Sequence, residues 1–371
     1  MSGISRTLRQ RASLVVSVVG LVLLGTTWGA NLSVVGAVLL AVFHVVLVMV
    51  SVTFAEAIAH KVGEPFGTLV LALSVTIIEV SLIVTLMITE GPKAESLARD
   101  TVFAAIMIVC NGVVGLSILV GARRQHHVRF SEQGAQALLG TVMTIATLSL
   151  VMPTFTVSSE GGTFTGSQLA FSAIAAAVVY VVFVSVQTVR LRWMFLSPEA
   201  LEAESSDGVR VGPTETTSTT SLTLSFLVVM LMISLVGVVG LAKTLAPRIE
   251  DVVDWAGAPQ SFVGVIIAMM VLLPESIAAT KAAARGEMQT SLNLSLGSAL
   301  ASIGLTIPAI AVASVWLDGP ITLGLGGKEV VLLALTALIG ALTFGSGRAT
   351  VIQGVQHLTI FAAFLFLAIV P

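Results

Sequence analysis

Charged residues are scarce in this chain. Only 10% of its 371 residues are Asp, Glu, Lys or Arg, whereas soluble domains carry about 25%. The hydrophobic share is 56% and the mean hydropathy is +1.03. These values exclude an ordinary soluble domain and indicate an all-α integral membrane protein that crosses the bilayer many times.

Other absences narrow the function. Cys110 is the single cysteine, so no internal disulfide can form. The formal net charge is −2 and no cluster of basic residues is present, so we expect no nucleic-acid partner. The N-terminal apolar stretch has no Ala-x-Ala cleavage site, and we interpret it as a retained helix and not as a signal peptide.

Long apolar runs are what the sequence does contain. A membrane-spanning helix needs about 20 mostly apolar residues. Eleven stretches meet this requirement and predict eleven transmembrane helices: 12–29, 33–60, 66–89, 100–121, 135–153, 166–189, 221–245, 261–283, 289–316, 328–345 and 349–370.

The one sizeable polar insertion is residues 190–220. Its first part predicts a short acidic helix in water, and its Thr/Ser-rich second part predicts a linker. An electrostatic role for the acidic residues in attracting cations is the alternative. The helices and this insertion predict four parts. They are an extra N-terminal helix (1–32), a first five-helix repeat (33–189), a cytoplasmic acidic loop (190–220) and a second five-helix repeat (221–371).

Lys and Arg orient the predicted helices. If the N-terminus is cytoplasmic and eleven helices alternate, most of the 18 Lys and Arg residues fall on the cytoplasmic side. This is the distribution that the positive-inside rule requires, and it places the C-terminus outside. The outer side receives only Lys93, Arg99, Lys243, Arg248 and Lys328.

Two glutamates occupy corresponding positions in the two sets of helices. Because five is odd, the sets enter the membrane from opposite sides, which is the condition for the inverted repeats of secondary transporters. Glu79 and Glu275 each lie on the second helix of their set. An ionised carboxylate at bilayer depth costs roughly 2.5 kcal/mol or more. A matched pair of such groups therefore predicts a cation or proton site.

The neighbours of the glutamates add oxygen atoms. Thr76 lies one helical turn before Glu79. Pro274 precedes Glu275 and has no N–H, so it leaves the carbonyl of Met270 without its helical partner. That carbonyl and the Ser276 hydroxyl are ligands that a hard cation prefers. The alternative for Pro274 is a kink that serves packing alone.

The helices that follow the glutamate helices also carry polar residues. The first contains Asn111, and the second has a stripe of hydroxyl groups at Ser291, Ser295, Ser298 and Ser302. We predict that Asn111, Ser298 and Ser302 belong to the binding site. Close packing and hydrogen bonds between helices are the alternative, and for any single serine they are the simpler one.

Glu56 and His60 lie four residues apart near the cytoplasmic end of the second helix. They could relay protons to Glu79, because histidine titrates near neutral pH. The alternative is a pair at the membrane interface that reaches water. His126 and His127 are interpreted as part of a basic cytoplasmic loop.

Together these segments resemble the calcium/cation antiporter superfamily, in its cation/proton-exchanging branch and among its bacterial ChaA-type members. The resemblance covers nearly the whole chain and is carried by residues 55–79, 99–112, 273–276 and 294–308. It implies one extra N-terminal helix plus two inverted five-helix repeats in the bacterial cytoplasmic (inner) membrane.

The resemblance also implies roles for individual residues. Glu79 and Glu275 would be shared cation and proton ligands, Asn111 the polar position on the next helix, and Glu56 part of the proton path. Eukaryotic members have Gly-Asn three and four residues before each glutamate, where this chain has Val75-Thr76 and Val271-Leu272. It therefore offers fewer oxygens than the six to eight or so that calcium takes.

We therefore predict a secondary active transporter that exchanges cytoplasmic cations (Ca²⁺ and/or Na⁺, K⁺) for protons by alternating access. Its partners are the lipid bilayer and these ions, and no cofactor is expected. The order of ion preference, the stoichiometry and the oligomeric state stay open. A passive cation channel is the alternative, although channels usually form their selectivity rings from several subunits. The sequence contains no His-Glu-x-x-His motif, which argues against an intramembrane metalloprotease.

Overall fold

The computed structural model describes residues 3–30, 32–62, 66–90, 95–196, 222–316 and 321–370. The described chain forms eleven continuous helical segments, as predicted, and nine of them are long and apolar enough to span a membrane. The other two, near the N-terminus and around Glu79, have shorter described apolar stretches at Ala12–Thr27 and Thr76–Thr85. The predicted fold class, an all-α integral membrane protein, is confirmed.

Contacts divide the helices into two compact units. The first unit, Met1–Thr89 with Thr216–Gln260, combines the first helices with one from the second half of the chain. The predicted boundaries of the two repeats run along the sequence and so differ from this division; they stay a prediction. The helices of the first unit are α1 (Gly3–Thr27), α2 (Val34–Val62), α3 (Phe66–Glu90) and α10 (Leu224–Trp255).

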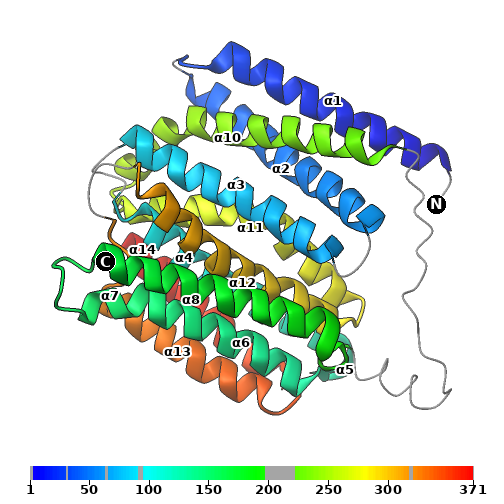
Figure 1. Cartoon of the computed structure of the whole chain (residues 1–371). Coiled ribbons are helices and arrows are strands. Elements are labelled where there is room, and N and C mark those ends of the chain that lie inside the picture. The colour runs from blue at the N-terminus through cyan, green and yellow to red at the C-terminus, as the bar shows by residue number, and fades with distance from the viewer. Residues whose placement is uncertain are drawn as a thin grey trace. The chain divides into compact units, whose positions relative to one another are not determined.

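Small residues bring three helices of the first unit close together. Figure 1 shows α1, α10 and α2 side by side. Leu47 of α2 is fully buried against Gly20 and Gly237, where an added Cβ would lie 2.8 and 2.9 Å from it. Beside this contact the Ser17 and Ser234 hydroxyls form a 2.8 Å hydrogen bond. Glycine and serine at such positions let helix backbones approach inside a membrane.

The second unit, Glu90–Glu215 with Ser261–Pro371, contains the remaining helices. Its most deeply buried span is built from α4, the π-helical turn η2 and α5. Helix α12 contacts this span and also α6, α8 and α11. The bounds are α4 (Leu97–Met107), η2 (Ile108–Val113), α5 (Val114–Gln125), α6 (Glu132–Ala146), η3 (Thr147–Val151), α7 (Met152–Phe155), α8 (Gly166–Ser185), η4 (Val186–Arg190), the 3₁₀ turn η5 (Arg192–Phe195), α11 (Ser261–Ala284), α12 (Met288–Ala313), α13 (Gly327–Phe344) and α14 (Val351–Ile369).

Side-chain caps fix where several of these helices begin. Thr165 and Gln168 form a reciprocal capping box at the start of α8, and Thr350 and Gln353 form one at the start of α14. Ser131 accepts a hydrogen bond from the Gly134 N–H at the start of α6. These side chains satisfy backbone donors that have no partner within the first turn.

The structure contains a short strand pair that was not predicted from the sequence. Strand β1 (His127–Arg129) pairs antiparallel with β2 (Arg348–Thr350), with Val128 opposite Ala349. His126 has a positive φ of 59°, which turns the chain from α5 into β1. The prediction of a basic cytoplasmic loop around His126 and His127 did not include this strand, because a three-residue strand has no periodicity that a sequence can reveal.

Candidate functional site

Glu79 and Thr76 lie on α3 in the first unit. Glu79 is only 3% exposed and Thr76 only 5% exposed, so the helix presents both side chains to the protein interior. Ile78, Leu82 and Ile83 beside them are also buried. At 1.5 Å per residue, Glu79 lies about 20 Å along the helix from Phe66 and about 16 Å from Glu90. The carboxylate is therefore near the middle of its span.

Glu275 lies on α11 in the second unit and is half-buried. Helix α11 continues through the buried Pro274 without a break. The Ser276 hydroxyl donates to the Leu272 carbonyl at 2.7 Å, so its oxygen lone pairs remain available to a cation. The part of α11 around Glu275 thus offers a carboxylate and a hydroxyl oxygen, next to a proline that frees one backbone carbonyl.

The hydroxyl stripe of α12 is largely inside the protein. Ser291, Ser295 and Ser302 are buried, whereas Ser298 is half-buried. The Ser295 hydroxyl donates to the Ser291 carbonyl at 2.8 Å, within the same helix. Helices α11 and α12 contact each other, so the two carry Glu275 and the predicted serines on neighbouring elements.

Asn111 is fully buried in the π-helical turn η2. Its amide nitrogen lies 2.9 Å from the Thr336 hydroxyl of α13, and its amide oxygen lies 3.2 Å from Nδ1 of His357 on α14. The other ring nitrogen of His357 is 3.1 Å from the Thr343 hydroxyl. His357 was not among the site residues predicted from the sequence, although a histidine within a membrane-spanning helix is a signal that could have indicated it.

The second unit therefore brings several predicted residues together. The turn η2 contacts both α11 and α12, so Asn111, Glu275 and the α12 serines lie on three mutually contacting elements. Thr76 and Glu79 belong to the first unit. The predicted side chains of Glu56 and His60, and the acidic loop from residue 197 onward, lie outside what the structure describes.

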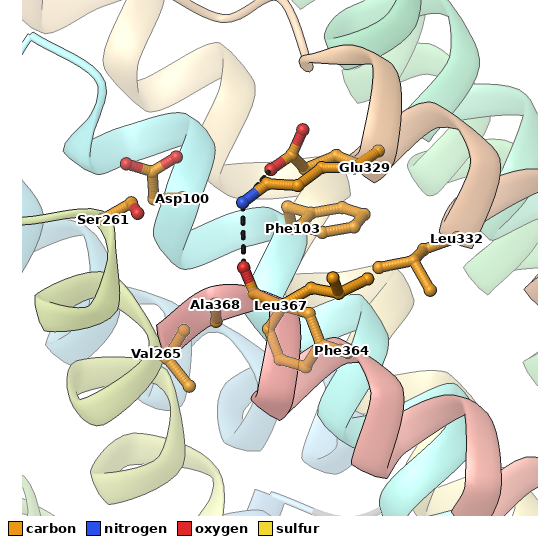
Figure 2. Close-up of a pocket in the computed structure, with 10 residues that line it drawn as sticks. Asp100, Phe103, Ser261, Val265, Glu329, Leu332, Phe364, Leu367 and Ala368 are labelled. Carbon is orange, nitrogen blue, oxygen red and sulfur yellow. Dashed lines mark hydrogen bonds and ion pairs between the residues drawn. The ribbon is translucent and has the colours of Figure 1, made fainter. Parts of the chain in front are cut away.

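A pocket opens at one end of the second unit, among α4, α11, α13 and α14 (Figure 2). Its polar wall comes from Asp100 and Glu329, and Lys328 also lines it. Lys328 Nζ is 2.8 Å from the Leu367 carbonyl and 3.6 Å from the Glu329 carboxylate. The lysine thereby binds a carbonyl of the last turn of α14 while it pairs with the acid.

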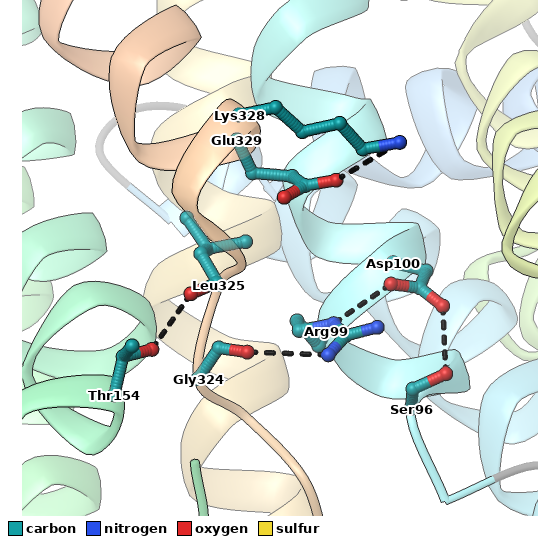
Figure 3. Close-up of polar contacts among 8 residues, drawn as sticks. All are labelled: Ser96, Arg99, Asp100, Thr154, Gly324, Leu325, Lys328 and Glu329. Carbon is teal, nitrogen blue, oxygen red and sulfur yellow. Dashed lines mark hydrogen bonds and ion pairs between the residues drawn. The ribbon is translucent and has the colours of Figure 1, made fainter. Parts of the chain in front are cut away.

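Asp100 is held by its own neighbours (Figure 3). It accepts hydrogen bonds of 2.8 Å from the Ser96 hydroxyl and from Arg99 Nε. Arg99 also donates to the Gly324 carbonyl at 3.2 Å, and Thr154 donates to the Leu325 carbonyl at 2.7 Å. These bonds join the loops at this end of the unit, and both Asp100 oxygens are used in them.

Outside the spans, an ion pair with Arg285 changes the pKa of the Glu287 carboxyl group. Arg285 donates to the two oxygens of Glu287 at 3.0 and 2.9 Å, in the connection between α11 and α12. This hydrogen bonding lowers the pKa of the Glu287 carboxyl below its usual value. Both side chains are exposed to water, so the pair belongs to the surface and not to the buried constellation.

Known proteins share both the sequence and the fold. The family model described as sodium/calcium exchanger protein matches residues 11–189 and 226–370. The chain belongs to the sodium/calcium exchanger family. This exchanger is 42% identical to the protein y4hA of Sinorhizobium fredii over 324 residues, 87% of this chain and 86% of the relative.

It is also 33% identical to the sodium-potassium/proton antiporter ChaA of Escherichia coli over 364 residues, 97% of this chain and 96% of the relative. The solved structure of the H⁺/Ca²⁺ exchanger CAX shares its fold, with a TM-score of 0.72 at 15% identity, over 98% of this chain and 88% of that one.

Family membership settles the class of function. This exchanger is an integral membrane ion transporter and not an enzyme. The resemblance to the calcium/cation antiporter superfamily stated from the sequence is confirmed.

Proposed function

We propose that this exchanger carries out cation/proton antiport in the bacterial cytoplasmic membrane. Cytoplasmic Ca²⁺ and/or Na⁺ and K⁺ would leave in exchange for protons, with Glu79 and Glu275 as the shared ligands. The observation that carries the proposal is the carboxylate of Glu79, 3% exposed in the middle of an apolar helix, with Glu275 at the matching place in the second set of helices.

The relatives support coupling to protons. ChaA, 33% identical over nearly the whole chain, bears the name of a sodium-potassium/proton antiporter. CAX, which has the same fold, is an H⁺/Ca²⁺ exchanger. The two names agree on the proton and differ in the cation. The choice among Ca²⁺, Na⁺ and K⁺ is therefore left to experiment.

A buried carboxylate can couple the two ions because it binds them in competition. Removal from water raises the pKa of a carboxyl group, and an arriving cation lowers it again. Cation binding at Glu79 or Glu275 then releases a proton, and protonation releases the cation. If the site faces one side of the membrane at a time, this mutual exclusion produces exchange. Thr76, Asn111, Ser276, Ser298 and Ser302 would supply further oxygens, and Glu56 and His60 a proton path from the cytoplasm.

Replacement of each glutamate by glutamine tests the assignment. In inside-out vesicles with an acidic interior, the wild type is expected to dissipate the pH gradient when a transported cation is added. Glu79→Gln and Glu275→Gln keep the shape of the side chain and remove its titratable group, so each should reduce this signal at least about 100-fold, as the loss of an essential acid or base does. Ca²⁺, Na⁺ and K⁺ are added one at a time.

Glu287→Gln is the matched control. Its carboxylate is exposed and paired with Arg285 outside the spans, so the variant should exchange like the wild type. Equal amounts of each variant in the membrane exclude failed insertion. Normal exchange by either Glu79→Gln or Glu275→Gln would overturn the assignment. Cation flux without any change in the pH gradient would instead identify the passive channel.

A further inference from the structure

Four polar side chains form a connected group inside the second unit. Asn111, Thr336, Thr343 and His357 are each no more than 1% exposed, and they come from η2, α13 and α14. They bond to one another in the order Thr336, Asn111, His357, Thr343. Buried polar groups need such partners, and a group that links three elements determines how they pack.

The hydrogen bonds define which atom of each group donates. The Thr336 hydroxyl donates its one hydrogen to the Leu332 carbonyl at 2.8 Å, so its oxygen accepts from the Asn111 amide nitrogen. The amide oxygen of Asn111 therefore faces Nδ1 of His357 at 3.2 Å. That contact requires a hydrogen on Nδ1, and in the neutral ring Nε2 then accepts from the Thr343 hydroxyl.

The imidazole itself has little freedom to move. Its ring stacks on Phe344, with centroids 6.3 Å apart and planes at 26°. Helix α5 also approaches His357 so closely that a Cβ on Gly115 would lie 3.0 Å from the Cβ of His357. His357 is therefore a rigid donor against which the Asn111 amide is oriented.

We propose that His357 is a positioning residue for ion exchange, which orients the Asn111 amide by a hydrogen bond from Nδ1. The inference rests on the proposed exchange function. Asn111 lies in a π-helical turn that contacts both α11, the helix of Glu275, and α12. Turns of this kind occur frequently at functional sites, because they change the direction of a side chain within a helix. Without His357, the amide can rotate and present its nitrogen where its oxygen was.

Two substitutions distinguish the role of Nδ1 of His357 from that of Nε2. Asparagine at position 357 can place an N–H where Nδ1 is now, whereas the longer glutamine side chain reaches toward the position of Nε2. We expect His357→Asn to keep the wild-type apparent KM for the cation within about threefold. His357→Gln and His357→Leu should raise it about tenfold with little change in maximal rate, the factor that corresponds to one lost buried hydrogen bond.

Thr343→Val is the matched control. It removes the partner of Nε2 and leaves the bond between Nδ1 and Asn111 in place, so it should lower thermal stability in detergent but keep the wild-type KM. A wild-type KM in His357→Leu at equal abundance, or an equal rise in His357→Asn and His357→Gln, would overturn the inference. If His357→Leu does not accumulate, the Asn and Gln variants decide alone. A wild type without cation-driven proton movement would refute the proposed function instead.

Discussion

At the scale of single residues, Glu79 and Asn111 are two of the buried polar groups on which the proposed site depends. Glu79 is buried at the middle of α3, and Asn111 is fixed by partners on two other helices. The presence of these residues was visible in the sequence because each interrupts an apolar run. The partners of Asn111 were not, because contacts between residues more than 200 positions apart depend on packing.

Thr76 tests whether the neighbours of the glutamates influence the affinity. It is buried one turn before Glu79. Thr76→Val keeps the shape and removes the hydroxyl, so we expect a rise of about three- to tenfold in the apparent KM for the cation, from the loss of one polar contact.

The readout for Thr76→Val is the cation dependence of pH-gradient dissipation in vesicles. Thr144→Val is the control, since the Thr144 hydroxyl bonds to the Gly140 carbonyl of its own helix and is exposed. An unchanged KM in Thr76→Val would remove Thr76 from the site.

At the scale of elements, hydrophobic length predicted all eleven helices, because a span is long and its signal accumulates over about 20 residues. The π-helical turns η2, η3 and η4 and the strand pair β1–β2 were not predicted. Each is only three to six residues long, and the two strands that pair lie more than 200 residues apart in sequence. The helices and the residue types of the site could therefore be predicted from the sequence. The packing of other helices around Asn111 could be learned only from the structure.

The contact between α5 and α14 gives a prediction at this scale. A Cβ on Gly115 would lie 2.9 Å from the backbone carbonyl oxygen of Gly354, and backbone cannot move aside as a flexible side chain can. We expect Gly115→Ala to lower the free energy of unfolding by about 1–3 kcal/mol, the range for overpacking. Thermal unfolding in detergent measures it.

Gly140→Ala is the matched control for this contact. Gly140 lies inside α6 with no atom within 4 Å of the added Cβ, so alanine should stabilise the protein by about 0.5–1 kcal/mol through helix propensity. Equal stability of the two variants would contradict the close approach of α5 and α14.

At the scale of the molecule, hydrogen bonds join the connections between helices at both ends of the second unit. Thr322 N–H donates to the Glu95 carbonyl at 3.2 Å, and Gly324 N–H donates to the Gly162 carbonyl at 2.7 Å. At the other end Phe130 N–H donates to the Gly347 carbonyl at 3.0 Å. Each of these three bonds joins connections that alternating helices would place on the same side of the membrane.

Labelling of single cysteines tests which end faces the cytoplasm. Gln133 and Ser346 are exposed near the β1–β2 end, where Arg129 and Arg348 lie, whereas Ser158 is exposed between α7 and α8. The positive-inside rule places the arginine-rich end in the cytoplasm. In a Cys110→Ser background, Gln133→Cys and Ser346→Cys should therefore resist a membrane-impermeant maleimide in intact cells, and Ser158→Cys should react. Inverted vesicles should give the reverse pattern.

Labelling of Gln133→Cys and Ser158→Cys from the same side would contradict the alternation of helices. Reversal of all three results would keep the fold but invert the direction in which cations leave.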